Sequence, residues 1–214
     1  MIRLSWNLET NTPSYGNGDS LSLNQVKCLN HGDSCNTLNF SMSNHLGTHI
    51  DFPYHFDKKG KNLSDFSNDF FFFQNILTFE INKNESELIT AQDLSKFEAN
   101  KTCEIILFKT GWSNKRNLTS YMMTPPGVHK DCADYIRKKF PKVRAIGFDF
   151  ISLSSFTNRE MGRESHKAFL QNKSPICIIE DMDLRSFSNL KNLLISPLMI
   201  DQADGAPVTI WANI

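Results

Sequence analysis

The chain has 214 residues, of which 40% are hydrophobic and 21% are charged, as is ordinary for a globular protein with one core. Its 23 basic and 23 acidic side chains cancel, which argues against a nucleic-acid partner, because such a partner selects a clustered basic surface. No apolar run approaches the roughly 20 residues that cross a bilayer, so we predict one domain over residues 1–214 and no membrane partner.

The cysteines argue against a disulfide framework, because their number is odd and no C-x-x-C pair occurs among Cys28, Cys35, Cys103, Cys132 and Cys177. The first residues also lack the apolar stretch of a signal peptide. Both observations predict a cytoplasmic protein.

The first half of the chain contains two predicted strands, over residues 3–8 and 37–43. The second alternates apolar and polar residues, which is the period-two pattern of a half-buried strand. Four phenylalanines in a row, 70–73, cannot all face one side of a strand, so we expect them in the core, in a pocket wall or at a subunit contact. Thr90 is expected to cap a short helix over 91–97.

The second half alternates strands with helices. Residues 104–111 read as a buried strand that ends at a glycine turn, and 130–140 have helical spacing up to Pro141. The remaining segments are a strand over 143–149, a helix around 165–171, and strands over 176–180 and 208–212. This order predicts an α/β domain with a mixed sheet.

Three of the chain's 6 histidines lie in one short segment, His45-Leu-Gly-Thr-His-Ile-Asp-Phe-Pro-Tyr-His55. An extended chain would place His45, His49, Asp51 and His55 on one face, but about 13 Å would separate the first two. Ligands of one zinc ion each lie about 2.0–2.2 Å from the metal, so the chain must bend, and Gly47 permits the bend.

A helix is the competing geometry, because His45 and His49 are four residues apart as in the H-E-x-x-H zinc motif. Gly47, Pro53 and the β-branched residues between them argue against it, and Leu46 stands where that motif has its glutamate. We therefore expect a bent loop. Two imidazoles and a carboxylate suit zinc or manganese, whereas the alternative is a histidine-rich turn that binds nothing.

Further candidates lie elsewhere in the chain. His166 lies on the predicted 165–171 helix, and Glu180 ends a buried strand, where a charge needs a partner, so either a ligand or a structural role is open to both. Asp149 could orient a ligand histidine or serve only as a strand end. Three aromatic residues could form a wall for an aryl substrate, although core packing explains Phe52 equally well: Tyr15, Phe52 and Tyr54.

The histidine segment resembles the signature of the metal-dependent cyclase family, which includes bacterial kynurenine formamidases and isatin hydrolases. Similar motifs run along nearly the whole chain: Thr110-Gly-Trp112, Gly147-Phe-Asp-Phe-Ile-Ser-Leu153, Ser165-His-Lys-Ala-Phe-Leu170, Ile179-Glu-Asp-Met-Asp-Leu184 and Asp204-Gly-Ala-Pro-Val208. Tyr15 stands where formamidases carry a tryptophan that contacts the substrate.

The resemblance implies a swivelling β/β/α fold, a homodimer or homotetramer, and one or two Zn²⁺ ions per subunit, with Mn²⁺ as the alternative. It implies that His45, His49 and Asp51 hold one ion and that Asp51 bridges to a second. His166 and Glu180 would complete the second site, and His55 would donate and accept the proton.

The implied activity is hydrolysis of small aryl amides, as in an arylformamidase, by metal-activated hydroxide with His55 as general acid and base. One alternative keeps the metal but opens a cyclic amide or lactone, or closes a ring. Another is a metal-binding protein without turnover. A thiol hydrolase is disfavoured, because neither Cys103 nor Cys177 has a histidine-bearing motif nearby.

Overall fold

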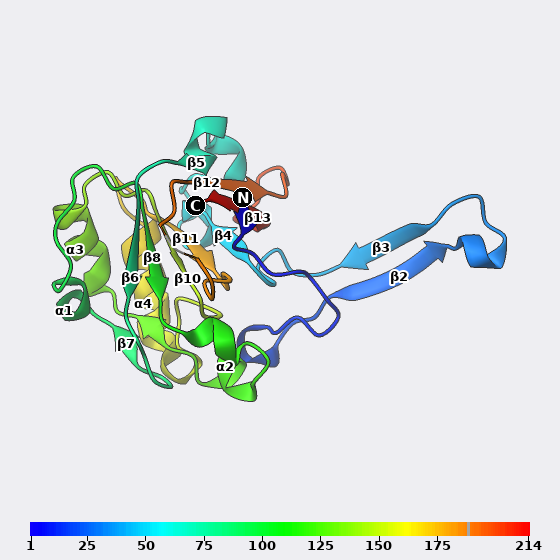
Figure 1. The fold of residues 1–214 in the computed structure, drawn as a ribbon, viewed down its shortest axis with the longest axis horizontal. Coiled ribbons are helices and arrows are strands. Elements are labelled where there is room, and N and C mark those ends of the chain that lie inside the picture. Colours follow the sequence, from blue (N-terminus) through cyan, green and yellow to red (C-terminus); the bar gives the residue numbers. More distant parts are fainter. Residues whose placement is uncertain (188) are drawn as a thin grey trace.

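A computed structural model describes residues 1–187 and 189–214. Within these residues one large mixed sheet of nine strands dominates the body of the molecule (Figure 1). Its strands run in the order β5 (Phe72–Phe73), β12 (Asn192–Pro197), β13 (Gly205–Asn213), β4 (His49–Asp51), β11 (Cys177–Glu180), β10 (Ala145–Phe148), β8 (Ile105–Lys109) and β6 (Ile76–Glu80), with β1 (Ile2–Arg3) also paired to β13.

Besides short 3-10 helices, the described residues also form four α-helices and two small strand pairs. The helices are α1 (Ala91–Leu94), α2 (Thr119–Met123), α3 (Asp131–Lys139) and α4 (Arg159–Leu170), and the pairs are β2 (Ser22–Lys27) with β3 (Thr37–Ser41) and β7 (Leu88–Ile89) with β9 (Gly127–Val128). Among the described residues no helix has the length and apolar character to span a bilayer. The predicted α/β fold with a mixed sheet is confirmed.

Two buried apolar clusters pack against this sheet. One lies toward α3 and α4 and includes Ile106, Ile136 and Phe169. The other lies toward β12 and β13 and includes Phe52 and Ile210. Side chains on a strand point alternately to the two faces, so neighbouring residues of β8 belong to different clusters. The sheet is therefore covered on both faces.

Most predicted elements are present with shifted ends. The strands predicted over 104–111, 143–149 and 176–180 are β8, β10 and β11, and α4 begins six residues before the predicted helix, at Arg159 rather than 165. The opening strand is shorter than predicted, because only Ile2–Arg3 pairs with β13 and Ser5 forms a single bridge to Met182.

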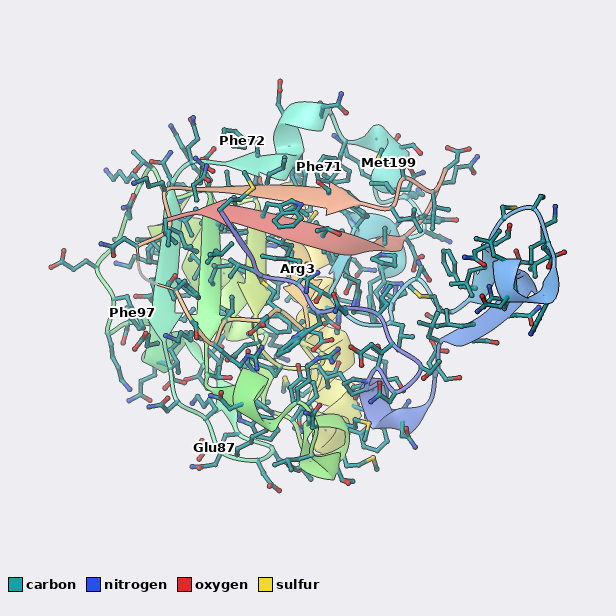
Figure 2. All side chains as sticks on the ribbon, turned by 45° about the vertical axis from the view of Figure 1, so that its right-hand side comes forward. Arg3, Phe71, Phe72, Glu87, Phe97 and Met199 are labelled. Atoms are coloured by element: carbon teal, nitrogen blue, oxygen red, sulfur yellow. The ribbon has the colours of Figure 1, made fainter. Side chains whose placement is uncertain are left out.

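The four phenylalanines divide between a 3-10 helix, Asn68–Phe71, and the strand β5 that follows it. Phe71 and Phe73 are buried and Phe70 packs against the same cluster, whereas Phe72 is 41% exposed on β5. Figure 2 shows Phe71 and Phe72 beside the short β5 strand at the edge of the sheet. The predicted core position is therefore confirmed for three of the four.

The β2–β3 hairpin projects away from the body of the protein (Figure 1). All residues of both strands are exposed. The prediction of a half-buried strand over 37–43 is therefore wrong for the single chain. The alternating pattern is present, but within residues 1–187 and 189–214 no element covers its apolar side.

Strand pairing at the centre of the sheet decides which residues meet. β4 lies antiparallel between β11 and β13, with Glu180 opposite His49 and Gly205 opposite Asp51. Asp204 immediately precedes that glycine. Three carboxylates and a histidine from distant parts of the chain are thereby placed along the short strand β4.

Candidate metal centre

The bend predicted at Gly47 is present. Gly47 has φ 72°, in the left-handed region that favours glycine, and an added Cβ would lie 2.7 Å from Leu8 Cδ2. The chain then becomes extended at β4, so the expected loop is in part a strand of the central sheet. Because side chains alternate along a strand, His49 and Asp51 share a face. His45 returns to that face from beyond the bend.

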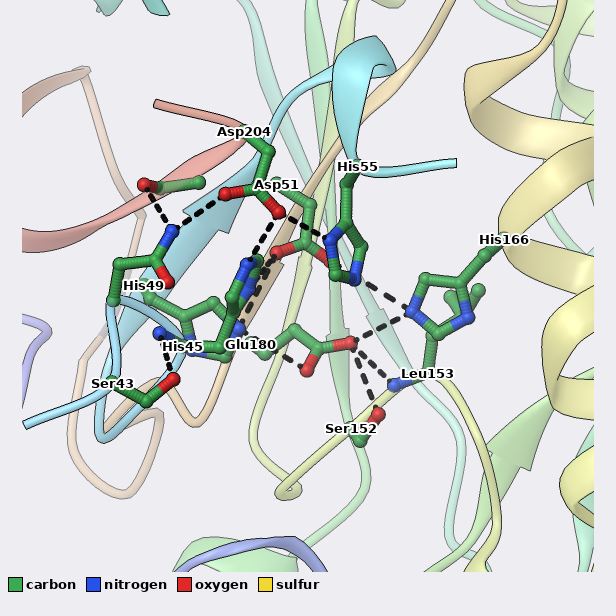
Figure 3. Close-up of polar contacts among 12 residues, drawn as sticks. Ser43, His45, His49, Asp51, His55, Ser152, Leu153, His166, Glu180 and Asp204 are labelled. Carbon is green, nitrogen blue, oxygen red and sulfur yellow. Dashed lines mark hydrogen bonds and ion pairs between the residues drawn. The ribbon is translucent and has the colours of Figure 1, made fainter. Parts of the chain in front are cut away.

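His49 lies between two carboxylates. Its Nε2 atom is 3.4 Å from Asp51 Oδ1 and 3.4 Å from Glu180 Oε2. All three side chains are 5% exposed or less. Glu180 is held by the Leu153 N–H, which donates to its Oε1 atom over 2.7 Å (Figure 3).

Helix α4 brings His166 to the same carboxylates. His166 Nε2 lies 3.5 Å from Glu180 Oε1 and 3.7 Å from Asp51 Oδ2. The helix approaches closely because Gly162 has no side chain: an added Cβ would lie 2.0 Å from Ser154 Oγ. The structure thus unites His166 and Glu180 with the histidine segment, as the resemblance implied.

The hydrogen bonds on the far side of these rings show that the donor set fits a cation. The Nδ1 atoms of His49 and His166 lie 2.8 Å from the carbonyl oxygens of Gly47 and Gly162. A carbonyl only accepts, so each Nδ1 carries the proton, and a neutral ring then presents the Nε2 lone pair toward Asp51 and the neighbouring glutamate. Lone pairs facing carboxylates repel unless a cation or proton lies between them.

A second group of donors forms around His45. Its Nδ1 atom lies 2.9 Å from Asp51 Oδ1 and its Nε2 atom 3.0 Å from Asp204 Oδ2. The same Asp204 oxygen lies 2.7 Å from His55 Nδ1, and Asn44 donates to the other oxygen over 2.8 Å. Figure 3 shows these contacts converging on Asp204 and Asp51.

The donor atoms fall into two groups, within each of which they lie less than 4.8 Å apart: His45, Asp51 and His55, and His49, Asp51 and Glu180. Asp51 belongs to both, as a bridging carboxylate would. The grouping differs from the expected one, which combined His45 with His49. The reason is strand pairing, because β11 places Glu180 directly opposite His49.

The local electrostatics follow from burial and the crowded acids. Burial lowers the pKa of His45, but Asp51 and Asp204 outweigh it and raise that pKa to about 10. Burial lowers the pKa of His49 as well, and Asp51 and Glu180 reverse the effect. The pKa of Asp51 is lowered, because His45 and His49 outweigh its own burial. These imidazoles therefore favour a positive charge, as a proton or a bound cation, beside the carboxylates.

A cavity of about 360 Å³ opens over the donors and is lined by Pro13, Ser14, Tyr15, His45, Gly47, His49, Asp51, His55, Phe56, Ile151, Ser152, Ser154, Arg159, Arg163, His166 and Glu180. Tyr15 lines it as expected. The predicted aromatic wall is corrected for the other two residues: Phe52 is fully buried and packs on Phe66 and Phe71, and Tyr54 lies outside the cavity, 45% exposed. Phe56 lines the cavity instead, and its ring stacks on the His166 ring with the two centroids 4.7 Å apart.

Two further comparisons with the sequence concern aspartates. Asp149 contacts no ligand histidine; it accepts bonds from Thr110, Gly111 and Ser113, so its role is the structural one at a strand end. Asp204 was not identified as a site residue, although its motif near the chain end was recognised. Only the pairing of β13 with β4 reveals its position.

Comparisons with known proteins agree with this architecture. The family model described as putative cyclase matches residues 2–155. A kynurenine formamidase from Bacillus anthracis is 31% identical over 176 residues, covering 82% of this chain and 78% of the relative. A kynurenine formamidase from Geobacillus thermodenitrificans (strain NG80-2) is 28% identical over 178 residues, with the same coverage of 82% and 78%.

Solved structures share the fold. Isatin hydrolase A from Labrenzia aggregata superposes with a TM-score of 0.82 at 17% identity, covering 99% of this chain and 92% of that one. The structure of a predicted metal-dependent hydrolase from Bacillus stearothermophilus superposes with a TM-score of 0.78 at 20% identity, covering 99% of this chain and 96% of that one. The family model matches more than half of the chain, and the matched residues include the histidine segment. The chain therefore belongs to the metal-dependent cyclase family.

Proposed function

We propose that the protein is a metal-dependent hydrolase of small amides, with aryl formamides as the favoured class. The observation that carries this proposal is the position of Asp51, which is shared by two groups of nitrogen and oxygen donors beneath one cavity. The family relatives named kynurenine formamidase support the same chemistry.

The donors suit zinc, with manganese as the alternative, and two ions are compatible with the two groups. The proposed ligands are His45, His49, Asp51 and Glu180 from these groups, with His166, whose Nε2 atom faces Asp51 and Glu180. His55 is left out because its Nδ1 atom contacts Asp204. A bound ion of this kind supplies hydroxide near neutral pH, by lowering the pKa of its water toward about 7, and polarises the substrate carbonyl.

His55 is the proposed general acid and base. Its Nδ1 atom is engaged with Asp204, so Nε2 is the nitrogen free to carry a proton into the cavity that His55 lines. Amide cleavage breaks the bond between the carbonyl carbon and nitrogen, and the nitrogen must gain a proton to leave as an amine. His55 holds that proton at Nε2, and Asp204 orients the ring.

Buried thiols do not offer an alternative nucleophile. Burial raises the pKa of Cys103 to about 12 and raises that of Cys177 further. A thiolate would therefore be scarce at neutral pH, and neither thiol is part of the cavity wall.

The test is a substrate panel of N-formylkynurenine, isatin, simple formanilides and lactones, measured together with the elemental content of purified protein. We expect zinc or manganese in the protein and the highest kcat/KM on the formamides. A higher kcat/KM on isatin or on a lactone would instead favour cyclic amides or lactones as the substrate class. Metal without any turnover would favour a non-catalytic metal-binding protein.

We also propose a homodimer or homotetramer, on the evidence of the β2–β3 hairpin. Leu23 pairs with Phe40 and Gln25 with Leu38, so three apolar side chains share one face of the ribbon. Leu23 is 43% exposed, Phe40 is 58% exposed and Leu38 is 53% exposed. A two-stranded ribbon alone is marginally stable in water, so this face needs a cover.

A second copy of the chain fits that requirement. A groove of about 470 Å³ lies at the base of the hairpin, where Phe40 forms part of its wall. Its lining is mixed, with apolar residues such as Trp6 and Leu198 beside polar ones. A twofold assembly would offer each copy's groove to the other's ribbon. Light scattering should give a multiple of the chain mass of 24.5 kDa, and L38E with F40E should give monomers, whereas N39E on the opposite face should not.

The single sheet shared by both apolar clusters supports one domain over residues 1–214. Cytoplasmic location stays a prediction from the sequence.

A further inference from the structure

The helix that carries His166 also lines the cavity with two arginines. Arg159, Arg163 and His166 are separated by four and three residues, so they lie along one face of α4. At 1.5 Å of rise per residue, Arg163 lies roughly 4.5 Å and Arg159 roughly 10 Å along the helix from His166. The two cations therefore extend the cavity wall outward from the carboxylate cluster.

Neither guanidinium has an acidic partner within the described part of the chain. Other arginines of the chain do have an acidic partner. Arg116 pairs with Asp181 over 2.7 Å, and Arg144 pairs with Glu104 over 2.8 Å. No ion pair or hydrogen bond of this kind engages Arg159 or Arg163. Both side chains are exposed to solvent at the cavity mouth.

The acids that line the cavity cannot neutralise these arginines. They are Asp51 and Glu180, both buried at its floor and already engaged with His49 and His166. The cavity thus has an acidic floor that suits a cation and a rim with two uncompensated positive charges. A ligand matching both ends would present its carbonyl to the floor and an anion to the rim.

The end of the rim beside Arg159 is also aromatic. Tyr15 packs edge-on against Phe156 with ring centroids 5.1 Å apart, and Arg159 lies over the Phe156 ring at 5.5 Å. The Tyr15 hydroxyl donates to the Ser155 carbonyl oxygen over 3.4 Å. A flat substrate group between floor and rim would contact Tyr15 while its far end reached the guanidinium groups.

We propose that Arg159 and Arg163 form an anion subsite that selects amides carrying a carboxylate several bonds from the scissile C–N bond. This inference rests on the amide hydrolysis proposed above and names its substrate class. Arginine suits the task because its planar fork donates two parallel hydrogen bonds to a carboxylate. A hydrogen bond to a charged group contributes enough to raise kcat/KM roughly tenfold.

The test compares two formamides of equal ring electronics: meta-formamido-phenylpropanoate and the neutral meta-formamido-phenylpropanol. The wild type should hydrolyse the carboxylate with a kcat/KM about tenfold higher, and added salt should narrow the difference because it screens exposed charges. R159Q combined with R163Q should remove the preference, mainly through KM of the anionic probe. K167Q, which removes a cation of α4 outside the cavity, should leave both probes unaffected.

Equal kcat/KM values in the wild type, or a preference that survives in the double variant, would overturn the subsite. The second result would mean that the carboxylate binds at the floor instead. If neither probe is hydrolysed, the amide hydrolase proposal fails, and calorimetry with phenylpropanoate and phenylpropanol still decides the subsite. Tighter binding of the acid that is lost in the double variant supports it, and equal binding refutes it.

Discussion

The Nδ1 atom of His55 lies 2.7 Å from a carboxylate oxygen of Asp204, although 149 residues separate them in the chain. The contact exists because β13 pairs with β4 and delivers Asp204 to the turn that follows β4. The same oxygen also contacts His45 Nε2 over 3.0 Å. The partly exposed carboxylate of Asp204 thus orients two histidines of the cavity, His45 and His55.

Replacing Asp204 with Asn should lower kcat by about 10- to 100-fold, because an amide neither stabilises a charged His55 ring nor fixes its proton on Nδ1. Steady-state kinetics on a formanilide and metal analysis would measure this. D201N, on a nearby exposed acid bonded to Ser64, is the control and should behave as wild type. An unchanged kcat in D204N would remove Asp204 from the mechanism.

Replacing His55 with Ala should abolish turnover while the metal content persists. The reason is that His55 supplies the proton for the leaving nitrogen, whereas its Nδ1 atom is already occupied by Asp204. Elemental analysis of the purified variant beside wild type separates the two roles. Loss of metal in this variant would make His55 a ligand.

Replacing Asp51 with Ala should remove both metal and activity, because Asp51 belongs to both donor groups. E180Q, which alters only the group around His49, should retain part of the metal. Metal titration by calorimetry, with circular dichroism to confirm folding, would compare the two. A fully active D51A enzyme would contradict the bridging role.

Acid stability should depend on Glu104. Burial raises the pKa of this carboxyl, but the N–H groups of Gln74 and Asn75 and the Arg144 guanidinium outweigh it, so the pKa is lowered. A lowered folded-state pKa contributes stability that is present above the unfolded value of about 4.3 and is lost as pH falls through the folded value.

Denaturant titrations of wild type and E104Q should therefore differ by about 1 kcal/mol at pH near 7, with wild type more stable. The difference should shrink at lower pH, as Glu104 becomes protonated. A difference that is independent of pH would show that the charge of Glu104 does not matter.

Local chemistry was sufficient to predict the motif and many of the elements. The glycine that bends the histidine segment, the apolar runs of β8, β10 and β11, and the capping residues of α1 are all properties of neighbouring residues. The helix around His166 was predicted, but the first six residues of α4 were not. Arg159 and Arg163 have no apolar spacing that marks them as inward-facing.

Pairing between distant strands was beyond the reach of sequence patterns. β4 has three residues, too few to show a period, and it becomes a central strand only because β11 and β13 flank it. Phe52 looked suitable for a cavity wall, yet alternation on that strand turns it into the core. The hairpin shows the converse, since its correct alternation predicted a burial that the single chain does not supply.

The sequence by itself determined that two imidazoles and an acid lie on either side of a hinge that only glycine permits, because residue type and backbone freedom are local. The tertiary structure alone decided that Asp204, Glu180 and the two cavity arginines surround them. Those positions depend on strand register and helix packing, which arise from contacts between residues more than 100 positions apart in the chain.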